Sequence, residues 1–177
     1  AQPDPSFAWT VAGTTNIGRC EVALIDLTSQ TWLTTNEVNR TLWKHWLTVA
    51  RPKDRAHDTA LLVIAGGANR EGDRPKPSAE LTRIAEATRS VVVELKMVPN
   101  QPLIFHGDGK ERVEDDLIAY TWDQFLRTGD TRWPARLPMT KSVVRAMDAV
   151  GAFTATETGG RRPVSTYVVA GGSKRGW

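Results

Sequence analysis

Residues 167–177 decide the fold, and they read YVVAGGSKRGW. A short apolar run leads into two glycines, and Ser173 follows them directly. This order is typical of a nucleophile elbow, in which a strand ends in a tight turn that exposes a serine before a helix begins. Glycine is needed before the serine because the turn is strained and the next helix passes close by.

The stretch departs from the usual Gly-x-Ser-x-Gly pattern of such elbows. Gly171 and Ser173 fit it, but Arg175 occupies the second glycine position and Gly176 comes one residue later. The motif by itself is also compatible with an ordinary turn that carries a surface serine. Other parts of the chain must decide between the two interpretations.

Three apolar runs predict buried strands, at residues 59–65, 90–98 and 165–170. Strands that are apolar on both faces are typical of a parallel sheet covered by helices. Between the first two runs, Ser78 is a candidate N-cap for a helix whose apolar residues share one face. The order strand, helix, strand predicts a right-handed βαβ unit.

The chain before this unit has a different character. Residues 1–20 contain prolines and little periodicity, so they are predicted to be an irregular lead-in. Residues 21–27 and 42–50 read as strands joined by polar residues. We expect these two strands to form an antiparallel pair.

Residues 98–164 are predicted to be a helical crossover between the second and third buried strands. After a loop-like start, one helix is expected over residues 111–128, where Gly129 ends it. Another helix is expected to begin at Pro138 and to end at Gly151.

The whole pattern predicts an α/β fold of the α/β-hydrolase type over residues 1–177. The sheet is expected to be mostly parallel with antiparallel N-terminal strands, and to be incomplete after the nucleophile elbow. Residues 1–177 are therefore the N-terminal portion of one domain in this interpretation.

Charge and composition exclude several classes of partner. The 177 residues carry 23 Lys and Arg against 20 Asp and Glu, and these charges are interspersed, so nucleic acid is not expected as a partner. No apolar run approaches the roughly 20 residues of a membrane span, so no transmembrane segment is expected. Neither the spacings of common metal sites nor the glycine patterns of nucleotide loops occur, so no metal and no cofactor are expected.

Acyl transfer requires a nucleophile, a base and donors for the oxyanion. Ser173 is the candidate nucleophile because it follows the carboxyl end of a strand, the edge at which open α/β sheets bind ligands. The backbone N–H of Lys174 is one candidate oxyanion donor. The second comes from Gly67 or Ala68, in the loop after residues 59–65. The expected substrate is a small-molecule ester or another acyl compound.

The base is missing from this pattern. His45, His57 and His106 all precede Ser173, whereas the acid and the histidine follow the serine in this fold. We expect all three histidines to be strand or loop residues without a catalytic role.

Lys174 and Arg175 follow the serine directly, where a helix is expected to begin. Cations are electrostatically out of place at a helix N-terminus. Their charge could help to bind an acidic substrate or the oxyanion, or their side chains could be solvated or paired within the protein.

Several longer segments extend the comparison to a known family: residues 26–32, 45–52, 64–67, and most specifically LPMTKSVVRAMD at 137–148 and GGSKRGW at 171–177. In these segments the chain resembles the PhoPQ-activated pathogenicity-related proteins, a branch of the α/β-hydrolase superfamily. The positions of Arg175 and Gly176 look like this family's own version of the elbow.

The resemblance implies a secreted or periplasmic protein, linked in bacteria to the regulation of virulence. A start at Ala1 is compatible with the removal of a signal peptide, and a chosen expression boundary would look the same. The resemblance also implies a longer chain, whose remainder would hold the rest of the sheet, the acid and the histidine. We therefore expect a complementary C-terminal chain of the same protein as a partner.

The glucuronoyl esterases look similar at the elbow, where a basic residue directly follows the serine. Their substrates are esters of uronic acids, which is an analogy for an acidic substrate and for Arg175 as a substrate-binding residue.

Three functions are consistent with these observations. The first is a serine hydrolase of the esterase type, with Ser173 as nucleophile and the base and acid supplied from a segment absent here. The alternative is a non-catalytic, hydrolase-like scaffold for binding or signalling, secreted or at the cell envelope. An aminopeptidase-like hydrolase differs only in its leaving group, and the residues do not separate it from an esterase.

Overall fold

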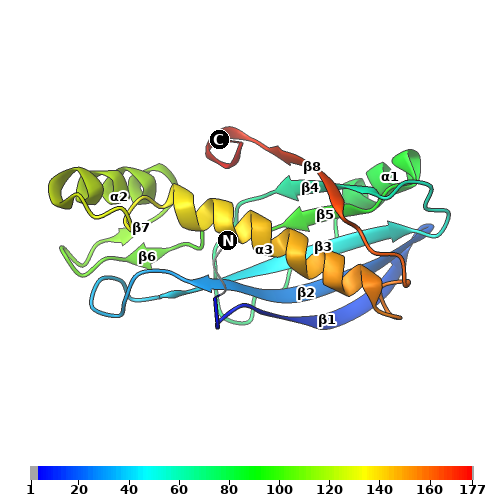
Figure 1. The fold of residues 1–177 in the computed structure, drawn as a ribbon, viewed down its shortest axis with the longest axis horizontal. Helices are drawn as coiled ribbons and strands as arrows, with labels where there is room; N and C mark the ends of the chain where they lie inside the picture. Colours follow the sequence, from blue (N-terminus) through cyan, green and yellow to red (C-terminus); the bar gives the residue numbers. More distant parts are fainter. Residues whose placement is uncertain (1–3, 177) are drawn as a thin grey trace.

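A six-stranded sheet in the order β1-β2-β3-β5-β4-β8 forms the centre of the computed structural model, which describes residues 4–176 (Figure 1). Its strands are β1 (Ala8–Ile17), β2 (Cys20–Thr31), β3 (Leu42–Pro52), β4 (Thr59–Ile64), β5 (Val92–Leu95) and β8 (Thr166–Gly171). The helices are α1 (Ala79–Thr88), α2 (Glu114–Thr128), α3 (Arg136–Ala155) and a short 3₁₀ helix, η1 (Ser173–Arg175). Among the helices formed by residues 4–176, none has the length and apolar character needed to cross a membrane.

Strand directions confirm the predicted combination of parallel strands with antiparallel N-terminal strands. The pairs β1–β2, β2–β3 and β3–β5 are antiparallel, whereas β4 is parallel to both β5 and β8. The predicted βαβ unit is β4-α1-β5, and Ser78 caps its helix, since its hydroxyl accepts a hydrogen bond of 3.2 Å from the Glu80 N–H.

The prediction of an irregular lead-in over residues 1–20 is wrong for the strand β1, while residues 1–3 lie outside the described part. Ile17 pairs with Cys20 across a two-residue turn in which Gly18 has a φ of +58°, a conformation that glycine adopts easily. The sequence pattern is weak because β1 is an edge strand with most of its side chains exposed.

The crossover between β5 and β8 also differs in detail. Leu103–Ile104 and Glu111–Arg112 pair as short strands, β6 and β7, so α2 begins only at Glu114. Gly129 ends α2 as expected, with a φ of +69°. Gly151 does not end α3, because it lies inside the helix, where a Cβ would come within 3.1 Å of the Val164 carbonyl oxygen. Gly151 therefore permits a close approach between α3 and the backbone at Val164, and it does not end the helix.

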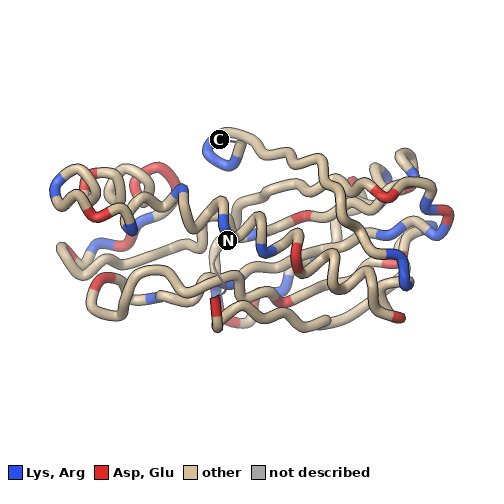
Figure 2. The backbone as a smooth tube through the Cα atoms, in the orientation of Figure 1, with Lys and Arg blue, Asp and Glu red and all other residues tan. Residues whose placement is uncertain are grey.

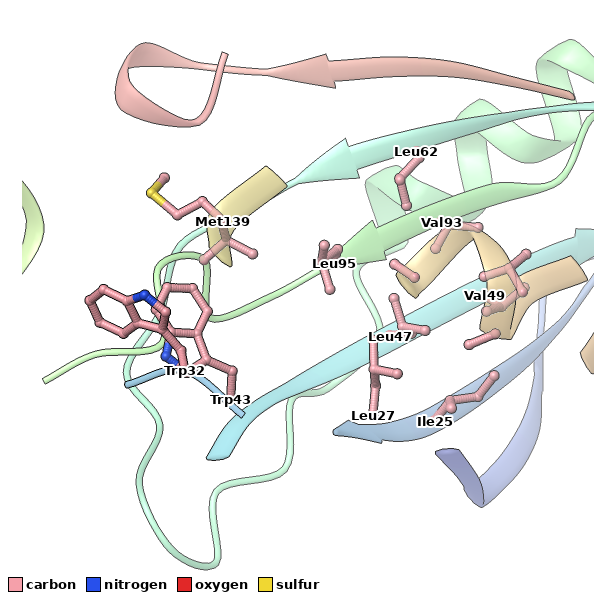
Figure 3. Packing of buried hydrophobic residues seen from close by; sticks show 14 of the residues in the cluster. Ile25, Leu27, Trp32, Trp43, Leu47, Val49, Leu62, Val93, Leu95 and Met139 are labelled. Carbon is pink, nitrogen blue, oxygen red and sulfur yellow. The ribbon is translucent and has the colours of Figure 1, made fainter. Parts of the chain in front are cut away.

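Two apolar clusters pack on opposite faces of the sheet. The larger lies between the sheet and α3, and its buried side chains include Leu47, Val49, Val93 and Leu95, which Figure 3 shows lying along β3 and β5. The smaller lies under α1. Complete burial of each such side chain stabilises the fold by about 1.5–3 kcal/mol, so the two clusters fix α1 and α3 on their faces.

A buried polar cluster also joins α3 to the sheet. His45 Nε2 lies 3.0 Å from Ser29 Oγ, and its Nδ1 lies 3.2 Å from the carbonyl oxygen of Lys96. Ser29 Oγ is in turn 3.1 Å from Ser142 Oγ of α3. Burial lowers the pKa of His45 to about 4, so the imidazole is neutral at pH 7. His57 and His106 are exposed.

Acidification should test the neutral state of His45. A pKa lowered from 6.5 to about 4 means that the unfolded chain binds a proton that the folded chain does not. As the pH falls from 6.5 to about 4, protonation of His45 in the unfolded chain should therefore lower the free energy of unfolding by roughly 3 kcal/mol. Melting temperatures of the wild type and His45→Gln at pH 7 and pH 4.5 measure this effect. The variant should lose less stability on acidification, and an equal loss would contradict the assignment.

Candidate functional site

The chain forms a closed turn around Ser173 directly after β8. Ser173 has a φ of +55°, the left-handed region that a residue with a side chain rarely occupies. The Arg175 N–H donates to the Gly172 carbonyl at 3.1 Å, and the Gly176 N–H donates to the Ser173 carbonyl at 2.9 Å. Ser173 thus has a left-handed backbone conformation at the start of the short helix η1, directly after β8.

The two outer glycines of the turn face each other. A Cβ on Gly171 would overlap the carbonyl of Arg175, and a Cβ on Gly176 would overlap the carbonyl of Gly171. Around Gly172, in contrast, a Cβ would meet no atom within 4 Å. The late position of the second glycine therefore has a steric reason, because this turn closes between residues 171 and 176.

The loop after β4 leaves the sheet beside this turn. Ile64 pairs with Gly171, so Gly66 and Ser173 each lie two residues beyond the last pair of the β4–β8 ladder. Gly67 has a φ of +125°, which requires glycine. Within residues 4–176, the backbone N–H groups of Gly67, Ala68 and Lys174 have no hydrogen-bond acceptor. The three N–H groups predicted as candidate oxyanion donors therefore lie in segments that follow the same edge of the sheet, and none of them is paired with a described acceptor.

The side chains of Lys174 and Arg175 are paired within the protein. Lys174 Nζ lies 3.0 Å from Glu114 Oε2 and 3.1 Å from Asp115 Oδ1. Arg175 Nη2 lies 2.7 Å from Glu114 Oε1, and its Nε donates to the Val98 carbonyl at 2.7 Å. Only 14% and 15% of the two cationic side chains are exposed. Of the alternatives left open above, pairing is the observed state, and substrate binding by Arg175 stays a prediction.

Glu114 is the residue of this site that the sequence did not indicate. It is the first residue of α2 and has a φ of +52°. Burial raises the pKa of its carboxyl, but hydrogen bonds from Gln101, Lys174 and Arg175 prevail and leave the pKa below its usual value. Its sequence neighbourhood reads as an ordinary acidic helix start, so no local signal distinguishes it.

Figure 2 shows that positions of basic and acidic residues are spread along the chain rather than gathered in a stripe. Lys174 and Arg175 lie in η1, close to the C-terminal end of the chain. The acidic start of α2 balances these two cations.

Apolar hollows flank β8 on both faces. On the α3 side, Val169 lines a hollow of about 260 Å³ together with Val143 and Met147. On the other face, Val168 lines one of about 330 Å³ together with Leu61. The prediction that residues 165–170 are buried is wrong for the described chain. β8 is the edge strand at the top of Figure 1, and Val168 and Val169 are 57% and 43% exposed because no described element covers them.

Comparisons with known proteins identify the family of this chain. The sequence model of the family described as PhoPQ-activated pathogenicity-related protein matches residues 1–177. The chain belongs to this family. Membership confirms the resemblance inferred from residues 137–148 and 171–177.

This member of the PhoPQ-related family is 41% identical over 177 residues to Autocrine proliferation repressor protein A of Dictyostelium discoideum. The match covers 99% of this chain and 35% of that protein. The structure of the present chain is similar to that of a glucuronoyl esterase from Solibacter usitatus, with a TM-score of 0.53 and 17% sequence identity. The match covers 98% of this chain and 47% of the esterase chain. This similarity shows the fold, which is of the α/β-hydrolase type. The PhoPQ-related chain thus spans about a third of the curated relative and about half of the esterase.

Substitution of the turn glycines should separate the steric roles of Gly171 and Gly172. Gly171→Ala should force the turn open, at a cost of about 1–3 kcal/mol, because the new Cβ meets backbone atoms that cannot move aside. Gly172→Ala is the matched control, since nothing lies within 4 Å and its φ of −101° suits alanine. Hydrogen exchange of the Arg175 and Gly176 amides should quicken only in Gly171→Ala. Equal exchange rates in the two variants would show that the turn does not depend on this approach.

Proposed function

We propose that the chain is the nucleophile-bearing part of a serine hydrolase of the esterase type. The observation that carries this proposal is the left-handed φ of Ser173 in a turn that Gly171 and Gly176 close after a strand. An unfavourable φ of this kind persists where the surrounding structure enforces it, and such residues cluster at functional sites. In this proposal the turn is a nucleophile elbow.

The chemistry would proceed by acyl transfer to Ser173. Its Oγ attacks the carbonyl carbon of an ester, and the developing oxyanion receives hydrogen bonds from the backbone N–H of Lys174 and of Gly67 or Ala68. These N–H groups have no acceptor within residues 4–176, which supports the assignment. Collapse of the tetrahedral intermediate releases the alcohol, and water then hydrolyses the acyl-enzyme.

The proton of the Ser173 hydroxyl needs a base. His45 does not serve, because it is fully buried and both of its ring nitrogens lie within hydrogen-bond distance of core groups. In this proposal the base and its acid lie in the part of the longer relatives that this chain does not span. An ester is the preferred substrate over a peptide because the structural neighbour is an esterase by its title.

A non-catalytic role in signalling is the second candidate. The curated relative is by its name an autocrine repressor of proliferation, which is a signalling function. The family description contains the words pathogenicity-related, which supports a link to virulence in bacterial members. A secreted or periplasmic location is part of both candidates. The reactivity of Ser173 distinguishes them.

We further propose that a complementary C-terminal segment of the same protein covers β8. Both faces of this strand are apolar and hollowed, and Val168 and Val169 are the exposed side chains. Exposed apolar edge strands favour pairing or aggregation, so a stable protein covers them. The length of the curated relative supports an intramolecular cover, because this chain matches only 35% of it.

Labelling with a fluorophosphonate tests the proposed nucleophile in the full-length protein. The wild type should form a covalent adduct on Ser173, and Ser173→Ala should form none and lose at least about 10³-fold in kcat/KM on a simple ester. Ser165→Ala is the control, because this exposed serine precedes β8 outside the turn. An unreactive wild type that is fully folded would favour the signalling scaffold instead.

A charge on β8 tests the proposed cover. In the full-length protein, Val169→Asp should destabilise by about 2–4 kcal/mol, because it places a carboxylate in an apolar interface. Thr166→Asp at the exposed start of the same strand is the control and should cost under about 1 kcal/mol. Chemical denaturation measures both values. Equal effects would mean that β8 stays open to solvent.

A further inference from the structure

We propose that Glu114 is a positioning residue for Ser173, because its carboxylate holds Lys174 and Arg175 together and so fixes the strained turn. This inference rests on the proposed function of Ser173. Glu114 and Arg175 are 61 residues apart in the chain, so the contact is made only by the tertiary structure.

The carboxylate divides its two oxygens between consecutive side chains. Oε1 accepts a hydrogen bond from Arg175 Nη2 at 2.7 Å, and Oε2 lies 3.0 Å from Lys174 Nζ. Charge-assisted bonds of this length are among the stronger ones in proteins. One rigid, planar group therefore sets the relative position of the two residues that follow the serine.

Two adjacent cations would otherwise repel each other. Both are mostly buried, where repulsion is screened less than in water. Asp115 also pairs with Lys174, but its side chain is 83% exposed, so this contact contributes little. Within residues 4–176, Glu114 is the one carboxylate that contacts both cations.

Further contacts hold the turn from its other sides. Arg175 Nε donates to the Val98 carbonyl, and its guanidinium packs over Gly66, where a Cβ would overlap it. Arg136 of α3 donates from Nη1 to the Lys174 carbonyl. With Glu114 removed, these contacts would keep the turn folded but leave the mostly buried side chain of Lys174 without its main carboxylate partner.

Gln101 extends this arrangement to the loop after β4. Its Oε1 accepts from the Glu114 N–H at 2.8 Å, and its Nε2 donates to Glu114 Oε1 at 2.7 Å. Its backbone carbonyl accepts from the Asn69 N–H at 2.6 Å, next to Ala68. One residue thus holds both Glu114 and the loop that carries the second proposed oxyanion donor. Glu114 therefore acts on the geometry between the nucleophile and its donors.

A positioning role predicts a loss in kcat rather than in substrate affinity. Misplacement of a reacting group by about 1 Å can cost about 10²-fold in rate. We expect Glu114→Gln in the full-length protein to lower kcat and the rate of fluorophosphonate labelling by about 10- to 100-fold, with KM within about twofold of the wild type. Glu114→Asp, which keeps the charge, should restore part of the loss. Gln101→Ala should lower kcat in the same way.

Asp115→Asn is the matched control. It removes a neighbouring carboxylate that also contacts Lys174, and it should leave kcat and labelling within about twofold. Wild-type kcat and labelling in Glu114→Gln would overturn the proposal, as would a loss that lies wholly in KM. If Glu114→Gln does not fold, Glu114→Asp decides: an intermediate kcat at an unchanged melting temperature supports the role, and a wild-type kcat overturns it.

Ser173→Ala keeps the two proposals apart. If this variant retains activity, the proposed function fails and the positioning role falls with it. If Ser173 is the labelled residue and Glu114→Gln behaves as the wild type, only the positioning role fails.

Discussion

The parallel pairing of β4 with β8 is the constraint on which the candidate site depends. Adjacent strands lie about 4.8 Å apart, and the register of Ile64 with Gly171 makes both strands end at the same level. The loop with Gly67 and the turn with Ser173 therefore leave the sheet as neighbours. Without this ladder the two segments would not be held side by side at one edge of the sheet, because each is short and rich in glycine.

Two different costs arise in the turn after β8, a steric cost at Ser173 and an electrostatic cost between Lys174 and Arg175. The steric cost of the left-handed φ stays with Ser173, while Gly171 and Gly176 let the surrounding backbone approach itself closely enough to close the turn. The electrostatic cost of two adjacent cations is relieved from α2 through Glu114. α3 adds a third support through Arg136, and the buried contacts of His45 and Ser142 in turn hold α3 on the sheet. The crossover between β5 and β8 thus links the sheet to the serine as well as joining two strands.

The family and the fold do not specify which reaction, if any, takes place at the site, because one fold serves many functions. One structural neighbour with this fold is an esterase by its title, whereas the curated relative is named for repression of proliferation. What distinguishes these roles is whether a base meets Ser173. The open, apolar faces of β8 lie next to the turn that would receive it.

Local patterns predicted much of the fold. The strands β2 to β5 and β8, the Ser78 cap and the end of α2 at Gly129 each depend on residues a few positions apart. The predictions that were wrong concern features whose reason lies in another part of the chain. β1 is a polar edge strand whose pairing is with β2, and Gly151 serves a close approach to Val164 rather than a helix end.

The sequence by itself determined the family, the β4-α1-β5 unit and the position of Ser173 after a strand, because these follow from short-range periodicity and a contiguous motif. Only the tertiary structure decided that Lys174 and Arg175 share the carboxylate of Glu114. These ion pairs join residues that are distant in the chain, and the charges of the side chains alone do not specify which groups meet.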